Sequence, residues 1–276
     1  MNHLFVDNLT VIDFAYLDAS RGLVGESWIV DVVLGGELDD QGMVFDFSNV
    51  KRTIKRVIDE RVDHRLVIPR AYKGLEWNED EPDSFTWHLT DGTRILHRSP
   101  DEAVVWLSSD RVVPSAVARL LEQELRAVLP ANVTDVDIAL REDVIEGAYY
   151  HYVHGLKKHM GNCQRIAHGH RSPIRIDRNE HRDRDLENQW AKRWQDIYVG
   201  SEEDVTQRWV AEDGTAYVTF EYEANQGEFA LTLSESRVYM LDSDTTVELI
   251  AAHIAGQLKS EFPEDAIRVK AYEGVG

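Results

Sequence analysis

The stretch YYHYVHGLKKHMGNCQRIAHGHR, residues 149–171, indicates both the fold and the chemistry of this chain. It contains Cys163, the single cysteine of the 276 residues, and five of the eleven histidines. His168 and His170 open a run with the composition of a β-strand, and side chains two apart on a strand lie on the same face. The pattern predicts that these two imidazoles can chelate one metal ion.

A third imidazole is expected from a neighbouring strand. Residues 149–153 form a short aromatic and β-branched run typical of strands, and this run ends at His154. Three neutral imidazoles and one open position are the usual ligand set of a catalytic zinc ion. The stretch therefore predicts a zinc site at His154, His168 and His170, with a histidine-rich loop that binds no metal as the alternative.

Cys163 lies five residues before His168 and allows two interpretations. As a fourth ligand it would close the coordination shell and make the site structural. As a thiolate beside the metal, with a pKa lowered by the cation and by Lys157, Lys158 and Arg165, it would move a proton during catalysis. We favour the second interpretation.

The charge of the chain excludes some partners. A formal net charge of -20 and a pI near 4.9 argue against binding to nucleic acid or to an anionic membrane. A single cysteine excludes an internal disulfide, and no apolar run approaches the ~20 residues of a spanning helix. Met1–Asp7 also lacks the basic and apolar regions of a signal peptide, so we expect a cytoplasmic protein that acts on a small molecule.

Hydrophobic periodicity divides the chain into two similar series of elements. In the first, we expect strands at 4–16 and 27–34, a helix at 45–62 capped by Asp46 or Ser48, a hairpin at Asp91-Gly92, a helix from Pro114 and a strand that ends at Glu142. In the second, we expect strands at 149–154 and from Ser172, a polar helical region within 179–195, a hairpin at 225–227, a helix at 247–258 and a strand that ends at Glu273.

This repetition predicts an internal duplication of one β-β-α-α-β unit, with units at 1–146 and 147–276. The fold class is α+β, with antiparallel sheets that carry helices on one face. Such sheets can join edge to edge into a β-barrel that leaves no strand unpaired. Two units cannot close a barrel, so we expect a homodimer or a higher homo-oligomer.

Motifs in both halves resemble the 6-pyruvoyltetrahydropterin synthase and 6-carboxytetrahydropterin synthase family of the tunnelling fold. Six segments of the chain are each similar to a family segment with a known role. These segments are the strand end at 153–156, the Cys to His-Gly-His segment at 163–170, the helix entry at 42–51, the pair Asp63-His64, and the strand ends Leu140-Arg141-Glu142 and Ala271-Tyr272-Glu273.

Each half departs from the family pattern in a complementary way. The first half has Val24-Gly25-Glu26 where His-Gly-His is expected, and the second has 241–245 where we expect an Asp-His pair. In family members with one unit per chain, the Asp-His pair of a neighbouring subunit completes the zinc site. The resemblance therefore implies one composite site, with Asp63 and His64 from the first half and the zinc ligands and Cys163 from the second.

The resemblance also implies a substrate, 7,8-dihydroneopterin triphosphate, and a role for each site residue. Glu273 is expected to anchor the pterin ring, with Glu142 as a relic, and Lys157 and Arg171 are expected near the triphosphate. Cys163 would shuttle a proton on the side-chain carbon, with His64, oriented by Asp63, as its acid-base partner.

We expect cleavage to 6-carboxy-5,6,7,8-tetrahydropterin, acetaldehyde and triphosphate, as in the 7-deazaguanine and queuosine route. Elimination of triphosphate to 6-pyruvoyltetrahydropterin is the alternative. A non-catalytic pterin- or metal-binding protein is another, which the polar segment 178–207 would favour if it replaces a helix of the family. The nitrile oxidoreductase of the same route ranks low, because its Glu-Ser-Lys-Ser-like motif is absent from the sequence.

Overall fold

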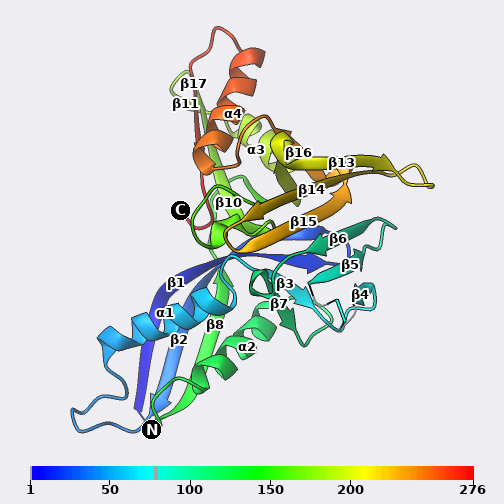
Figure 1. The fold of residues 1–276 in the computed structure, drawn as a ribbon. Coiled ribbons are helices and arrows are strands. Elements are labelled where there is room, and N and C mark those ends of the chain that lie inside the picture. The colour runs from blue at the N-terminus through cyan, green and yellow to red at the C-terminus, as the bar shows by residue number, and fades with distance from the viewer. Residues whose placement is uncertain (1, 78–79, 82) are drawn as a thin grey trace.

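The computed structural model describes residues 2–77, 80–81 and 83–276 (Figure 1). Within these residues the chain forms three β-sheets, four α-helices and several 3-10 turns. The predicted α+β class is therefore confirmed. In the part of the chain that is described, none of the helices has both the length and the apolar character needed to cross a membrane.

The first sheet has the strand order β7-β3-β1-β2-β8. Helices α1 and α2 pack on one face of it and bury their apolar stripes against β1, β2 and β8. Asp46 caps α1 by accepting a hydrogen bond from the backbone N–H of Asn49, as expected, whereas the side chain of Ser48 lies outside the described residues. The elements are β1 (Asn2–Asp18), β2 (Gly22–Gly36), α1 (Phe47–Arg61), β3 (Leu66–Pro69), β7 (Val104–Leu107), α2 (Pro114–Arg126) and β8 (Val133–Glu142).

The second sheet has the order β16-β12-β9-β10-β17, with the short β11 also paired to β10. Helices α3 and α4 cover it and share a core with Tyr150, Tyr152 and Trp194. The elements are β9 (Tyr149–His154), β10 (His168–Arg178), β11 (His181–Arg182), α3 (Arg184–Arg193), β12 (Ile197–Ser201), β16 (Val238–Leu241), α4 (Val247–Glu261) and β17 (Ile267–Ala271).

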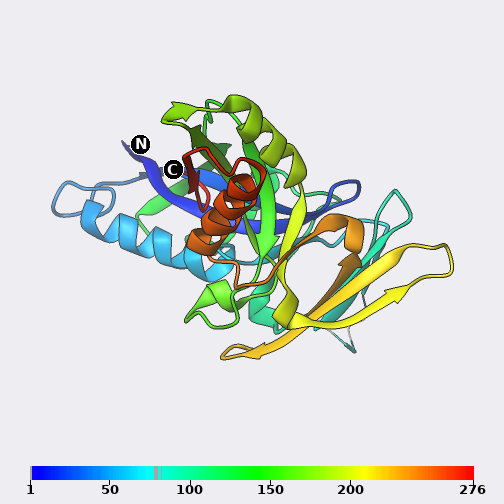
Figure 2. The same ribbon diagram turned by 90° about the horizontal axis from the view of Figure 1, so that it is seen from above.

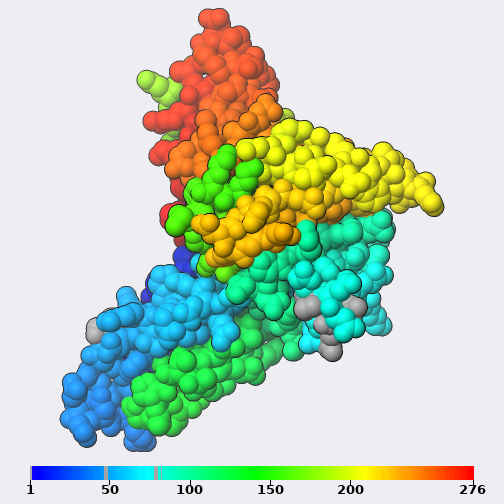
Figure 3. All heavy atoms as spheres, in the orientation of Figure 1, coloured from blue at the N-terminus to red at the C-terminus, as the bar shows by residue number. Residues whose placement is uncertain are grey.

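The third sheet joins strands from both halves of the chain. Its order is β13-β14-β15-β6-β5-β4, and the antiparallel pairing of Leu231 with His97 lies at the junction. Figure 3 shows the yellow and orange segment beside the cyan one that it joins. The strands are β4 (Leu75–Trp77), β5 (Ser84–His88), β6 (Arg94–Arg98), β13 (Val205–Val210), β14 (Ala216–Ala224) and β15 (Gly227–Ser234).

The first two sheets have the same topology. Each consists of an antiparallel hairpin (β1-β2 or β9-β10), a short strand parallel to it (β3 or β12), a second short parallel strand (β7 or β16) and a closing antiparallel strand (β8 or β17). In both, one helix follows the hairpin and one precedes the closing strand. This correspondence supports our proposal that the chain is a tandem of a first unit, 1–146, and a second unit, 147–276.

The structure corrects three expectations about how the elements combine. The described sheets are open and do not close into a barrel. The two main sheets do not join edge to edge, and only the added hairpins share a sheet. The segment 178–207 does not replace a helix, because it contains β11, α3 and β12, and α3 stands where α1 stands in the first unit.

The two main sheets cross where β1 and β2 meet β10, near the centre of the molecule (Figures 1 and 2). Gly25 on β2 and Gly169 on β10 are in close contact there. A Cβ atom on Gly25 would lie 1.9 Å from the carbonyl oxygen of Tyr152, and one on Gly169 would lie 2.7 Å from the Cα of Gly25. Side chains cannot fit at these distances, so glycine is required at both positions. The crossing brings the start of β10 into contact with the first unit.

Polar groups are buried where the sheets cross. Glu26 on β2 is 3% exposed, and its carboxylate lies 3.9 Å from the ring of His151. Burial, together with the negative charge of Glu142, raises the pKa of Glu26 to about 7 against the opposing effects of Ser27, Arg171 and Arg21. The folded protein therefore favours the protonated form of this carboxyl.

We predict that Glu26→Gln stabilises the protein at pH 8 but not at pH 4. A carboxyl with a raised pKa contributes stability below about pH 4.5, and this contribution is lost as the pH rises through about 7. The amide has no such loss, so the gain in unfolding free energy at pH 8 is on the order of 2–3 kcal/mol. Thermal or urea unfolding across this pH range, with the exposed Glu146→Gln as control, measures it. Equal pH profiles for wild type and Glu26→Gln would contradict the assigned pKa.

Candidate active site

Three histidines converge where the second hairpin begins and ends. His154 is the last residue of β9 and pairs with His168, the first residue of β10, and His170 follows on the same face as His168. All three side chains are buried, with 0–3% of their surface exposed. One ring nitrogen from each lies within 4.8 Å of the others, so the group is compact enough to hold one metal ion.

In two of the three histidine rings, a hydrogen bond to Nδ1 determines that Nε2 is the nitrogen available to a metal ion. Nδ1 of His154 is 2.9 Å from the carbonyl oxygen of Thr245, and Nδ1 of His168 is 3.0 Å from that of Arg165. A carbonyl only accepts, so each Nδ1 carries the proton and each Nε2 keeps its lone pair. Nε2 of His154 is buried without a hydrogen-bond partner. A metal ion would supply that partner.

Burial favours the neutral form of these rings. It is the largest cause that holds the pKa of His154 and of His168 well below the usual range, and the neighbouring histidines add to it. Neutral imidazole is the form that binds a metal ion. The electrostatics of the cluster therefore agree with its geometry.

Asp13 on β1 completes the surroundings of His170 and was not found by sequence analysis. Its Oδ1 lies 3.2 Å from Nδ1 of His170, although the two atoms are not aligned for a hydrogen bond, and it accepts a hydrogen bond from Ser27. A lone carboxylate within the apolar run 11–15 was the available signal. Carboxylates beside metal-binding histidines commonly orient the ring.

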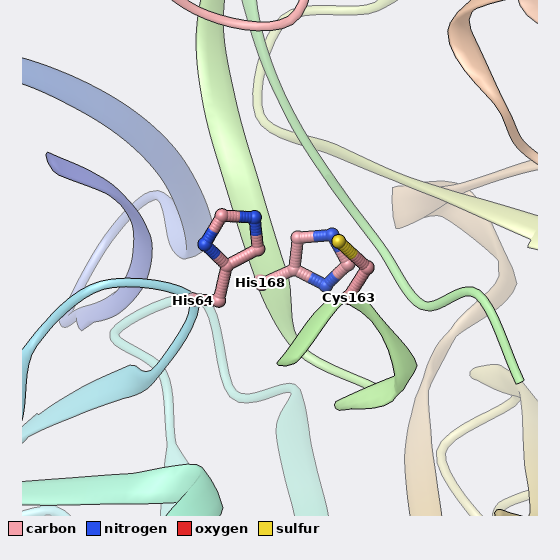
Figure 4. A group of neighbouring side chains, drawn as sticks. All are labelled: His64, Cys163 and His168. Carbon is pink, nitrogen blue, oxygen red and sulfur yellow. The ribbon is translucent and has the colours of Figure 1, made fainter. Parts of the chain in front are cut away.

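The loop after α1 carries Asp63 and His64 of the first unit, and Figure 4 shows the His64 ring beside this cluster. Asp63 Oδ2 is 2.8 Å from Nδ1 of His64, and Oδ1 accepts the backbone N–H of Asp13 at 2.9 Å. The backbone N–H of His64 donates to the carbonyl of Asp13 at 2.7 Å. These bonds tie the pair to β1, and His64 keeps a left-handed φ of +54°.

Cys163 approaches the same point from the second unit. It lies in a 3-10 turn, η2 (Asn162–Gln164), and is partly exposed. One side-chain ligand atom each of Cys163, His64 and His168 fall within 4.8 Å of one another, and Figure 4 shows the thiol beside the His168 ring. The structure thus brings together, within one chain, the residues expected from both halves.

The partners of His64 favour its protonated form. Burial lowers its pKa, but the hydrogen bond and charge of Asp63 and the interaction with Cys163 outweigh burial and raise the pKa to about 10. An imidazolium held between a carboxylate and a thiol can donate a proton and take it back. The arrangement could act as an acid-base relay next to a group of histidines that could hold a metal ion.

The remaining expected site residues are two glutamates and two basic residues. Glu142 is the last residue of β8 and Glu273 lies two residues after β17, and both are exposed. The guanidinium of Arg171 pairs with Glu142 at 3.4 Å and lies 4.2 Å from the centre of the Tyr149 ring. The ammonium of Lys157 is held by Asp204 and Glu203, so little of its charge is available to a substrate.

One expected equivalence between the units was misplaced. We expected the counterpart of Asp63-His64 at 241–245, a segment that begins at the last residue of β16. Asp63 and His64 instead precede β3, whose equivalent is β12, and Asp196 directly precedes β12. The segment 241–245 has another role, because Thr245 holds His154.

The family model of 6-pyruvoyl tetrahydropterin synthase matches residues 15–150, which include Asp63 and His64. Residues 15–150 belong to the 6-pyruvoyl tetrahydropterin synthase family. The resemblance inferred from the sequence is therefore confirmed, and the chain is about twice as long as the family proteins it matches, consistent with a duplicated form. The match ends before His151, so the histidine cluster lies beyond it.

Three archaeal proteins that are similar to this chain are provisionally named 6-carboxy-5,6,7,8-tetrahydropterin synthases. The Pyrococcus horikoshii protein is 22% identical over 137 residues, which cover 50% of this chain and 79% of the relative. The Pyrococcus abyssi protein is 23% identical over the same length. The Methanocaldococcus jannaschii protein is 26% identical over 132 residues, or 46% and 77% of the two chains.

Solved structures with similar coordinates include two 6-pyruvoyl tetrahydropterin synthases. That of Plasmodium vivax is 19% identical with a TM-score of 0.40, and the match covers 51% of this chain and 97% of that one. That of Plasmodium falciparum is 17% identical with a TM-score of 0.39 and the same coverage.

We predict that Asp63→Asn lowers the pKa of His64 in the metal-free protein. The amide removes the negative charge that favours the imidazolium, and an adjacent opposite charge commonly shifts a pKa by about 1–3. NMR titration of the His64 ring measures this change, with the exposed His181 as an internal reference. An unchanged titration of His64 would show that Asp63 does not govern its proton.

Proposed function

We propose that this chain is a zinc-dependent 6-carboxy-5,6,7,8-tetrahydropterin synthase. It would convert 7,8-dihydroneopterin triphosphate and water to 6-carboxy-5,6,7,8-tetrahydropterin, acetaldehyde and triphosphate. The observation that carries the proposal is the convergence of three buried imidazoles with a Cys163, His64 and Asp63 relay in one place. The family of residues 15–150 and the provisional names of the archaeal relatives support the reaction class.

A zinc ion fits the residues present. His154, His168 and His170 offer neutral imidazole nitrogens, and two of the rings have their Nδ1 atoms held by carbonyl groups. Two ligands of one zinc ion lie at most about 4 Å apart, because each Zn–N bond is about 2.0–2.1 Å long. The spread of 4.8 Å or less therefore requires only small side-chain rotations. Cys163 groups with His64 and His168 but not with His154 and His170, which favours a catalytic thiol over a fourth ligand.

When bound, zinc would act as a Lewis acid toward the hydroxyl groups of the substrate side chain. Asp63 holds Nδ1 of His64 and leaves Nε2 free to exchange a proton with Cys163 or with the substrate. Cys163 would remove and return the proton on the side-chain carbon. The buried surroundings of His154 and His168 would keep bulk water from competing for the metal.

The pterin ring would be anchored by a carboxylate at the end of a closing strand. We propose Glu273, because it belongs to the unit with the metal ligands and its charge acts on Tyr152, which lies against His170. Glu142 already pairs with Arg171. A carboxylate can accept two hydrogen bonds from the N–H groups of a pterin.

Elimination of triphosphate to 6-pyruvoyltetrahydropterin is the second candidate, and the family name of residues 15–150 favours it. Both outcomes begin with the same proton removal. A non-catalytic pterin- or metal-binding protein loses support, because the segment 178–207 folds as a regular part of the second unit.

Incubation of the zinc-loaded protein with 7,8-dihydroneopterin triphosphate tests the proposal. Equal amounts of acetaldehyde and 6-carboxy-5,6,7,8-tetrahydropterin support it. Release of triphosphate with 6-pyruvoyltetrahydropterin and no acetaldehyde would establish the second candidate. Tight binding without either product would overturn both enzyme assignments.

We predict that Cys163→Ala keeps its zinc and loses turnover by a factor of at least about 10²–10⁴, the usual effect of a lost acid-base group. His168→Ala should lose most of its zinc, because one of three ligands is gone. The exposed His181→Ala is the matched control and should change neither quantity. Zinc content by atomic absorption and single-turnover rates measure the two effects. Loss of zinc from Cys163→Ala would make the cysteine a ligand.

The open edges of the described sheets also support assembly. We propose that several chains combine their sheets in a homodimer or higher homo-oligomer. A stable monomer in analytical ultracentrifugation would count against this assembly.

A further inference from the structure

The first unit contains a counterpart of the histidine cluster that has lost its histidines. Tyr16 on β1 pairs with Val24 on β2 in the way that His154 pairs with His168. Glu26 lies two residues beyond Val24, where His170 lies two residues beyond His168. Tyr16, Val24 and Glu26 therefore hold the three ligand positions of the second unit.

The counterpart of His64 is Asp196. His64 lies two residues before the position on β3 that pairs with Ala15, and Asp196 lies two residues before the equivalent position on β12. Both have a left-handed backbone, with φ of +54° for His64 and +56° for Asp196, a conformation that few non-glycine residues adopt. The backbone thus presents Asp196 of the second unit to the first, as it presents His64 to the second.

The guanidinium of Arg21 lies among these counterparts. Its Nε donates to Asp196 Oδ2 at 2.9 Å, its Nη2 to Asp196 Oδ1 at 2.6 Å, and its Nη1 to the Tyr16 hydroxyl at 2.9 Å. Arg21 therefore forms hydrogen bonds with two of the four positions that correspond to the metal ligands and His64.

These contacts differ from an ordinary surface ion pair. The carboxylate of Asp196 is 15% exposed and is held by two parallel hydrogen bonds, a geometry that is stronger than a single contact. Burial raises the pKa of Tyr16 to about 12 despite the nearby Arg21, so its hydroxyl remains neutral. Exposed ion pairs contribute little to stability, but this one joins the two units and is partly shielded from water.

We propose that the first unit retains a closed cation site in which the guanidinium of Arg21 occupies the place that a metal ion has in the second unit. This contact clamps the hairpin β1-β2 to the start of β12. Because β1 also holds Asp63 and His64, the clamp keeps the acid-base pair beside Cys163. This inference rests on the proposed function in one respect, the presence of a metal ion in the second unit. It implies that each chain binds one metal ion.

Arg21→Ala tests the clamp and chemical rescue tests its occupant. We expect the variant to lose roughly 2–8 °C in Tm, because it loses a partly buried contact between the two units. Guanidinium chloride at a few millimolar should restore part of this loss, whereas sodium chloride at equal ionic strength should not. Arg141→Ala is the matched control, because Arg141 pairs with Asp31 at 2.7 Å within the first unit alone. That variant should show no rescue by guanidinium.

Metal content and turnover complete the test. Wild type and Arg21→Ala should each bind one zinc ion per chain, because the ligands all lie in the second unit, while turnover of the variant should fall about tenfold and recover with guanidinium. A second zinc ion in wild type, or an Arg21→Ala variant with unchanged Tm and no response to guanidinium, would overturn the proposal. If Tm is rescued but no zinc or turnover is found in wild type, the clamp stands and the proposed function fails.

Discussion

The close crossing of Gly25 and Gly169 is the constraint on which the rest of the structure depends. Any side chain at Gly25 would collide with the backbone of Tyr152 and His170, so the two sheets can meet here only through bare backbone. This contact places Asp13 next to His170 and lets Ser27 accept the backbone N–H of Arg171. If the sheets moved apart, Asp63 and His64 would no longer lie beside Cys163, and the candidate site would lose its acid-base pair.

The sequence predicts what depends on local periodicity and fails where pairing is distant. The long hairpin strands, three of the helices and the turns at Asp91-Gly92 and 225–227 carry clear patterns and were placed closely. Strands β3, β7, β12 and β16 have only four or five residues, so they show no alternation that could reveal them. The pairing of β6 with β15 joins residues far apart in sequence, and no local signal records it. The polar helical region expected within 179–195 is confirmed as α3, although its polar sequence gave only approximate bounds.

Some residues of the candidate site could likewise be predicted from local sequence patterns, and others could not. His168 and His170 were predictable because a two-residue spacing on a strand fixes a common face, and His154 because it ends the neighbouring aromatic and β-branched run. Asp13 and the carbonyl of Thr245 were not, because their roles arise only when β1 and the loop before α4 reach the cluster in three dimensions. Lys157 was expected near a substrate from its position in a basic stretch. In the folded chain Asp204 and Glu203 neutralise it, a pairing that distance in sequence conceals.

Loop length explains how two equivalent positions can have different occupants. The connection between β1 and β2 comprises residues 19–21, so Arg21 is held close to the strands and its own guanidinium reaches Asp196. The connection between β9 and β10 runs from 155 to 167 and carries Cys163 at the edge of the cluster, partly exposed. A buried carboxylate needs a compensating cation, and a short loop can supply one from its own sequence. In the proposed zinc site, a long loop with neutral imidazoles beneath it would leave the position to a metal ion from solution.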